Sequence, residues 1–398
     1  MRVVAPRIAP DDPQWWLDDI DSTCAWLRTD APIHTFAPGW RTVARHADVR
    51  AASCDPMRFS SAAGVLVDDP LRTNPNTARS VLMMDPPDHG RFRALVSRSF
   101  TPRAVAGLEP RLRELAGRVV DDAARAQSVA GSEPIDLVAA LAVPLPLQVI
   151  ADMLGMSDVD PAQFRIWSDE TIKAADGLRA DLGIVGEFLG AMGAAIEDHR
   201  RSPRDDVLQR LVDADVDGRA LDHGELLVYA MSLLVAGNET TRNLVSGGLL
   251  ALAAHREQRA WLGADRSRSA PAVEELLRWV TPIKAMCRTV VGAEVELAGT
   301  PLDDGDILVL LYGSANRDEA VWGPSAATLD LSRSIAGPQL AFGFGEHLCL
   351  GAALARLEAR VLFEEILTRF PEYEVVGEPT RLASTLINGW SRIEGVLR

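Results

Sequence analysis

The chain has 398 residues, of which 47% are hydrophobic and 24% are charged. This composition is typical of a globular protein with a large core, and the length allows one large domain or two to three ordinary ones. The formal net charge of −15 argues against nucleic-acid binding and against docking on an anionic membrane surface.

The sequence shows neither an export signal nor a membrane anchor. Residues 1–16 contain no apolar signal core, and the longest apolar run, 226–237, is too short to cross a bilayer. The four cysteines are Cys24, Cys54, Cys287 and Cys349, and they form no CxxC pair. We therefore expect free thiols in a cytoplasmic protein.

Helical periodicity dominates the chain, and we expect few strands. In chain order, the patterns predict a strand at 41–44, a long Pro- and Gly-rich loop at 56–90, helices at 104–127, 161–175, 181–201, 222–256 and 271–280, strands at 294–297 and 307–311, a helix at 350–369 and a strand at 393–396. Because helices and strands do not alternate, the expected fold is mainly α with small accessory sheets.

The longest predicted helix begins with a capping-box pattern at Asp222 and Glu225, and apolar residues then cover every face, so we expect it to be buried. Its AGNETTR segment places Glu239 and Thr240 in this apolar helix. A buried carboxylate is costly unless it is paired or functional. Gly237 would leave room for a ligand, and Ala236 shares a face with Thr240. The alternative is a polar kink in a buried helix.

A glycine-rich run, AFGFGEHLCLG, places Cys349 just before the helix predicted from 350. Gly343 and Gly345 permit a tight loop, and the start of a helix stabilises a thiolate. Gly351 leaves room for a flat group, and a thiolate in such a place can bind haem iron. Two alternatives are a structural cysteine and a zinc site that uses His347 and Cys349, although no second ligand cluster is present.

Two further pairs of residues share a helical face. Glu275 and Arg278 are three residues apart and can form an ion pair, which is common and of little value when exposed. His89 and Arg93 are four residues apart after Pro86 and Pro87, and they suit an anionic partner.

The pattern Phe342-x-x-Gly345-x-x-x-Cys349-x-Gly351 resembles the haem-binding signature of the cytochrome P450 family. The resemblance implies that Cys349 ligates the iron of haem b, and that Glu239 and Thr240 are the catalytic acid–alcohol pair that relays protons to dioxygen. It also implies a structural network of Glu275, Arg278 and Arg333. The residues that it implies for haem binding are His89, Arg93, Ala236, Gly237, Arg288, Phe342, Gly343, His347, Cys349 and Gly351.

The resemblance implies a cytochrome P450 fold in a single domain over residues 1–398, with the long central helix over the haem. It implies a monooxygenase that uses O₂ to hydroxylate a hydrophobic small molecule, such as a natural-product intermediate or a sterol, terpenoid or lipid. The alternative is a haem-thiolate protein without monooxygenation, namely a recruiter of a carrier protein, a ligand binder or a peroxide-using enzyme. An intact Glu239–Thr240 pair favours the monooxygenase.

The chain has no flavin-binding or iron–sulfur extension, so the resemblance implies electrons from NAD(P)H through a ferredoxin and its reductase. Arg91, Arg98 and Arg103 form a basic patch on an acidic protein, and we expect an acidic electron donor to dock there.

The substrate is defined only as a class. By position in the family, the segment 59–82 would cover a distal pocket, and the segment 170–190 over its entrance shows no specificity pattern. The expected lining residues are apolar, which predicts a hydrophobic substrate; they are Leu66, Val67, Leu82, Leu234, Ile283, Ala285, Met286, Leu386 and Ile387. Several of them could equally be plain core residues.

Overall fold

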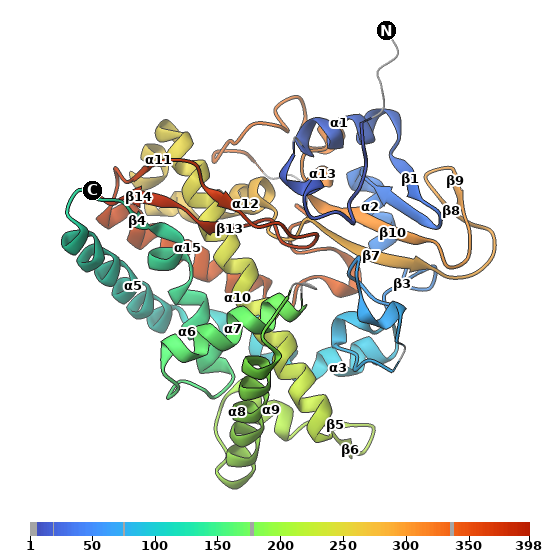
Figure 1. The fold of residues 1–398 in the computed structure, drawn as a ribbon, viewed down its shortest axis with the longest axis horizontal. Helices are drawn as coiled ribbons and strands as arrows, with labels where there is room; N and C mark the ends of the chain where they lie inside the picture. The colour runs from blue at the N-terminus through green and yellow to red at the C-terminus, as the bar shows by residue number, and fades with distance from the viewer. Residues whose placement is uncertain (1–5, 19, 75, 176–178, 335–337) are drawn as a thin grey trace.

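The computed structural model describes residues 6–398 except 19, 75, 176–178 and 335–337. Most of the long helices lie together on one side of the molecule, and a small twisted sheet lies on the other (Figure 1). The helices are α1 (Ile20–Asp30), α2 (His46–Ser53), α3 (Asp88–Ser97), α4 (Pro102–Ala106), α5 (Glu109–Ala130), α6 (Pro144–Met153), α7 (Pro161–Ala175), α8 (Leu182–Arg201), α9 (Val207–Val212), α10 (His223–Ala254), α11 (Arg256–Gly263), α12 (Ser269–Val280), α13 (Tyr312–Ala315), α14 (Glu319–Trp322) and α15 (Ala352–Arg369).

The largest sheet has the strand order β1-β2-β10-β7-β3, with β1 at Ile33–Ala37, β2 at Trp40–Val43, β10 at Ile307–Leu311, β7 at Ala285–Val290 and β3 at Phe59–Ser60. Strand β10 pairs parallel to β2 and antiparallel to β7. The remaining strands form smaller sheets: β4 (Ile135–Asp136), β5 (Asp215–Val216), β6 (Arg219–Ala220), β8 (Val295–Leu297), β9 (Thr300–Leu302), β11 (Glu374–Val375), β12 (Thr380–Arg381), β13 (Trp390–Arg392) and β14 (Glu394–Val396).

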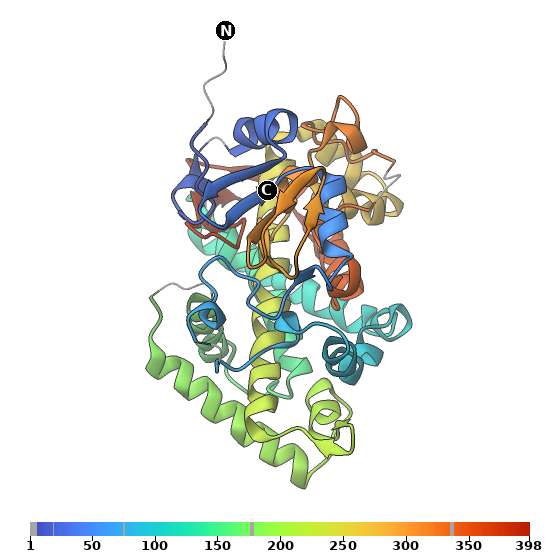
Figure 2. The ribbon, with the colours of Figure 1, turned by 90° about the vertical axis from the view of Figure 1, so that its right-hand side faces the viewer.

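Helix α10 runs through the middle of the molecule in both views (Figures 1 and 2). Its start is fixed by the predicted capping box, in which Asp222 accepts from the Glu225 N–H and Glu225 accepts from the Asp222 N–H. Helices α6, α7, α8, α12 and α15 all contact it. Their packing buries most of its apolar surface, which confirms the prediction of a buried central helix.

The sheet separates two smaller apolar cores. Along β10, Leu308 and Leu310 face one core, whereas Val309 and Leu311 face the other, together with Trp16 from the N-terminal segment. This is the alternation that a strand imposes on its side chains. Because both faces are buried, β10 reads in the sequence as a continuous apolar run.

The sequence-based elements are largely confirmed, with ends shifted by no more than three residues. The helix predicted at 104–127 is wrong as a single element, because α4 ends at Ala106 and α5 begins at Glu109. Pro110 in the first turn of α5 explains the break, since proline cannot continue a preceding helix. The segment 56–90 has little regular structure beyond β3 and short 3₁₀ turns such as Val81–Met83, before α3 begins at Asp88. Within the described residues, no helix combines the length and apolarity needed to cross a bilayer.

A completely buried ion pair links α12 to the segment that leads into the cysteine loop. Glu275 and Arg278 both have fully buried side chains and contact each other at 2.7 Å. Arg278 also donates to the carbonyl oxygens of Asn316, Ala326 and Thr328. Arg333 donates to Glu275 from the segment after Thr328, at 3.2 Å. The pair therefore differs from the exposed, weak pair that its spacing alone would suggest.

Replacement of Glu275 by Gln should destabilise the protein strongly. The substitution leaves Arg278 buried without a carboxylate, and breaking a buried pair in this way costs about 3–5 kcal/mol. Urea unfolding of the haem-loaded protein, followed by far-ultraviolet circular dichroism, measures this loss. Glu257→Gln is the control, because Glu257 is exposed and should change the free energy of unfolding by about 0.5 kcal/mol or less. Equal stability of the two variants would contradict the prediction.

Candidate active site

The loop from Phe342 to Gly351 is held tightly by its own backbone. The Cys349 N–H donates to the Phe342 carbonyl at 2.9 Å, and a 3₁₀ turn spans Gly345–His347. Gly345 has φ of +72°, and a Cβ atom there would lie 2.1 Å from the Ser53 carbonyl oxygen of α2. Only glycine fits at this position, because both the backbone conformation and the contact exclude a side chain.

Cys349 lies in this loop, three residues before the following helix, whereas the predicted helix start at 350 placed it directly before that helix. Helix α15 begins at Ala352, and Gly351 is its N-cap residue. The sequence had placed the helix too early because Leu350 continues the apolar pattern. Burial raises the pKa of the Cys349 thiol, and the hydrogen bond from the Gly351 N–H opposes part of that rise.

Cys349 is exposed although protein surrounds its thiol. Enough protein surrounds its thiol for desolvation to raise the pKa, yet the residue itself is exposed. Both observations agree if the sulfur borders a cavity within the molecule. Phe342, Gly343 and Gly351 around it are half-buried, and a Cβ atom on Gly351 would meet no atom within 4 Å.

The middle of α10 also has an uncovered face. Ala236 is exposed although Asn238 and Glu239 beside it are buried. The Thr240 hydroxyl donates to the Ala236 carbonyl, one turn back in the helix, at 2.8 Å. Gly237 does not leave room for a ligand as expected, because a Cβ atom there would lie 3.1 Å from the Ile150 side chain. Its role is close packing between α10 and α6.

Glu239 is buried at the centre of a hydrogen-bond network. Its Oε1 accepts from Arg242 at 2.8 Å and from the Asn243 side chain at 2.7 Å, whereas its buried Oε2 has no partner among the described residues. Burial raises the pKa of Glu239, and Arg242 opposes the rise. Arg242 also pairs with Asp169 of α7 at 3.2 Å, so one chain of charged groups joins Glu239 to a partly exposed carboxylate.

Four basic residues converge beside the cysteine loop. The rings of His89 and His347 lie 4.2 Å apart, and Arg93 donates to the Leu348 carbonyl at 2.6 Å. Burial, then Arg288, His89 and Arg93, lowers the pKa of His347 to about 3. Arg288 is 3% exposed, but within the described chain it donates only to the Cys287 carbonyl.

Arg93 and Arg288 have no carboxylate within ion-pair distance among the described residues, whereas His347 lies 3.4 Å from Glu346. Buried cations are stable when anions pair with their N–H donors. The two carboxylates of a haem supply such charge, and the exposed thiol of Cys349 supplies a ligand for its iron. The residues present therefore fit this cofactor.

The zinc alternative has no support in the described part of the chain. The only group of three candidate ligands there comprises Asp85, Glu346 and His347, and it does not include Cys349. Asp85 already accepts from the Ser60 hydroxyl and the Ser61 N–H, and His347 bonds the Ser61 hydroxyl at 3.1 Å. These contacts give Asp85 a structural role in holding the segment after β3.

The expected substrate-lining residues fall into two groups. Leu234 is completely buried in the helical core, and Val67 and Ala285 pack in the core beside Trp16, so these three behave as core residues. Ile387 is also buried. The half-buried members are Leu66, Leu82, Ile283, Met286 and Leu386. An isolated bridge between Ile283 and Ile387 joins two of the expected segments.

The three arginines expected to dock a redox partner are all exposed. Arg91 pairs with Asp88 and Asp217, so part of its charge is neutralised. Arg98 follows α3 and Arg103 lies on α4, which contacts α15. Neither Arg98 nor Arg103 has an ion-pair partner among the residues described.

Sequence reasoning missed Arg242, Asn243 and Asp169. The first two were detectable, because Arg242 and Asn243 follow Glu239 by three and four residues and so share its helical face. Asp169 was not, since no pattern indicated that α7 would bring its carboxylate to α10.

Comparisons with known proteins agree with this geometry. The family described as "Cytochrome P450" matches residues 270–381. A "Methyl-branched lipid omega-hydroxylase" of Mycobacterium tuberculosis is 39% identical, over 94% of this chain and 91% of the relative. A "Vitamin D(3) 25-hydroxylase" of Pseudonocardia autotrophica is 36% identical, over 93% of this chain and 91% of the relative.

A solved structure, "Mycobacterium marinum cytochrome P450 CYP268A2 in complex with pseudoionone", superposes with a TM-score of 0.88 and 32% identity, covering 99% of this chain and 100% of the other. The names of the two relatives also favour the monooxygenase over the alternative without oxygenation. The chain therefore belongs to the cytochrome P450 family and is a bacterial haem-thiolate monooxygenase that hydroxylates a hydrophobic small molecule.

Proposed function

We propose that the exposed Cys349 sulfur is the iron ligand and that the haem lies between the cysteine loop and the Ala236–Thr240 face of α10. The observation that carries this proposal is the exposure of both Cys349 and Ala236 inside a packed molecule. Phe342, Gly343 and Gly351 would line the ligand side. His89, Arg93, Arg288 and His347 would hold the haem carboxylates, because Arg93 and Arg288 donate only to backbone carbonyls among the described residues.

When bound, the haem supplies the activation of dioxygen, and the protein must deliver protons to it. We assign this delivery to Glu239 and Thr240. The free Oε2 of Glu239 can carry a proton in the core, and the raised pKa of this carboxyl favours the protonated form. Arg242 and Asp169 connect Glu239 toward solvent. The Thr240 hydroxyl stands on the exposed face and can pass a proton on.

The proposed substrate is a lipid or sterol-like molecule with a mostly hydrocarbon surface. The half-buried residues Leu66, Leu82, Ile283, Met286 and Leu386 are all apolar, as a pocket for such a molecule requires. The relatives named for a methyl-branched lipid and for vitamin D(3) support the same class.

We further propose that residues 1–398 form one P450 domain that works in the cytoplasm with a ferredoxin and an NAD(P)H-dependent reductase. The four described cysteines are all free, which suits a reducing compartment. The unpaired, exposed Arg98 and Arg103 suit an acidic donor such as ferredoxin.

Replacement of Cys349 by His should abolish the thiolate signature. In the wild-type protein, reduction and carbon monoxide should give a strongly red-shifted Soret band, because a thiolate donates electron density to the iron. Cys349→His should give a histidine-type band. Cys54→Ser is the matched control, because Cys54 is also an exposed, free cysteine, and it should keep the wild-type spectrum. A red-shifted band in Cys349→His would rule out this ligand.

Loss of the proposed proton donor should slow oxygenation without loss of haem. Glu239→Gln should lower product formation by about 10²-fold or more, as expected for a general acid, and should enlarge the solvent isotope effect. Thr240→Ala should divert reducing equivalents from product to hydrogen peroxide, whereas Thr240→Ser keeps the hydroxyl and is the control. Product and peroxide per NAD(P)H consumed measure both effects. If Glu239→Gln formed as much product per NAD(P)H consumed as the wild type, Glu239 would not be the proton donor.

Charge reversal at the proposed docking surface should slow reduction by ferredoxin. Arg98→Glu and Arg103→Glu should each lower the rate of the first electron transfer by several-fold at low ionic strength, and added salt should shrink the difference. Stopped-flow reduction with a ferredoxin measures it. Arg79→Glu, at an exposed arginine of the loop before α3, carries the same charge change and should stay near wild type. Identical rates in all three variants would refute docking at this surface.

A further inference from the structure

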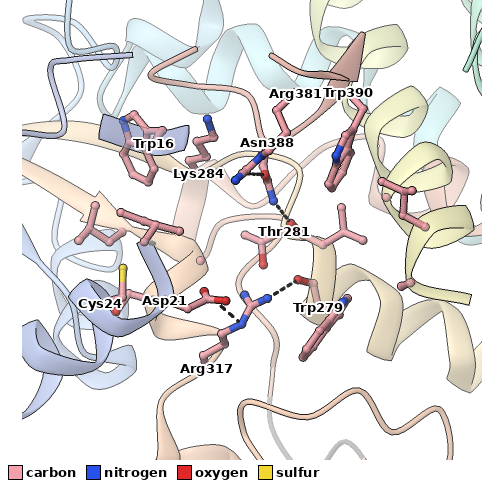
Figure 3. Close-up of a pocket in the computed structure, with 18 of the residues that line it drawn as sticks. Trp16, Asp21, Cys24, Trp279, Thr281, Lys284, Arg317, Arg381, Asn388 and Trp390 are labelled. Carbon is pink, nitrogen blue, oxygen red and sulfur yellow. Dashed lines mark hydrogen bonds and ion pairs between the residues drawn. The ribbon is translucent and has the colours of Figure 1, made fainter. Parts of the chain in front are cut away.

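A cleft of about 380 Å³ lies at the other end of α10 from its capping box. Its walls come from the N-terminal segment and α1, the C-terminal part of α10, the end of α12, α13 and the strands β12 and β13 (Figure 3). Gly247, its first wall residue on α10, is seven residues beyond Thr240, or about 10 Å along the helix axis. None of the residues assigned above to haem, substrate or catalysis lines it.

Three tryptophans form the apolar part of the cleft. Trp16, Trp279 and Trp390 stand on different sides of it in Figure 3 and come from three separate parts of the chain. Gly247 permits the close approach of Trp390, because a Cβ atom there would lie 2.7 Å from the indole ring. Large flat side chains around one space suit an aromatic or hydrocarbon body.

The polar part of the cleft is predominantly cationic. Among the described wall residues, Asp21 carries the only carboxylate, against the guanidinium groups of Arg317 and Arg381. Lys284 lies 5.2 Å from the centre of the Trp16 ring and donates to the Ser384 carbonyl. Arg317 has its Nε 3.6 Å from Asp21, which is a weak contact with a largely exposed side chain.

Arg381 is the cation with the least compensation. It donates to the Asn388 side chain at 3.1 Å, but its buried Nε has no acceptor, and no carboxylate of the described chain lies within ion-pair distance of it. Burial lowers the pKa of both Arg381 and Arg317, and Asp21 opposes the change. Burying an arginine without an anion is unfavourable, so an anionic ligand would be stabilised here.

We propose that this cleft is a second small-molecule site, separate from the haem, that binds a small aromatic carboxylate. The carboxylate would pair with Arg381 and Arg317, and the ring would pack among the three tryptophans. The cleft volume is within the range of sites for small ligands. Asp21 at the rim would disfavour ligands with further negative charge, which restricts the class to monoanions.

The test uses the haem-loaded enzyme saturated with an azole that ligates the iron, so that the reaction site is blocked. The probe is 2-naphthoate, and titration calorimetry measures its Kd. We expect binding below about 1 mM, at least about tenfold weaker binding of the neutral analogue 2-naphthamide, and at least about tenfold weaker binding to Arg381→Gln. Arg392→Gln is the control, since Arg392 is exposed on β13 and pairs with Glu394, and its Kd should stay within about twofold.

A second variant guards against misfolding of Arg381→Gln. Ala254 is an exposed wall residue on α10, so Ala254→Phe should fill the cleft without removing a charge and should also abolish binding. The carbon monoxide difference spectrum shows that each variant retains native haem. The proposal is overturned if naphthoate does not bind at several millimolar, if the azole displaces it, or if it binds wild type and all variants equally.

Discussion

The hydrogen bond from the Cys349 N–H to the Phe342 carbonyl closes the loop on which the proposed haem site depends. It turns the chain at Cys349, whose thiol is exposed and accepts from the Gly351 N–H at the start of α15. The same loop is fixed on one side by Arg93, which donates to the Leu348 carbonyl, and on the other by α2, which lies against Gly345. These contacts fix the position of the Cys349 backbone.

Support for this loop extends far from the sulfur. The buried Glu275–Arg278 pair binds the Asn316 carbonyl, and the Asn316 side chain accepts from the Leu340 N–H just before the loop. Asn316 also donates to the Thr281 hydroxyl at the end of α12. Through Asn316, the buried ion pair thus fixes the backbone at Leu340, just before the cysteine loop. This explains why an ion pair with a large desolvation cost is located beside the site.

Sequence patterns identified the long helices, the β10 strand and the cysteine loop because each carries a strong local signal. Continuous apolar residues mark β10, and a capping box marks the start of α10. Strand β7 was missed because its alternation is interrupted by Arg288, whose placement depends on the basic cluster and not on the sheet. The roles of Gly237 and Asp169 could not be read either. Both roles depend on which helix packs against α10, and no local sequence pattern indicates that packing.

One pair of extended segments contributes residues both to the tryptophan cleft and to the proposed substrate pocket. The Lys284 N–H donates to the Leu386 carbonyl and the Asn388 N–H donates to the Pro282 carbonyl, with the Ile283–Ile387 bridge between them. Side chains alternate along such a pair. Lys284 and Asn388 line the tryptophan cleft, whereas Ile283, which we propose to line the substrate pocket, does not line the cleft. The proposed ligand in the cleft would therefore lie against the same pair of segments that carries Ile283.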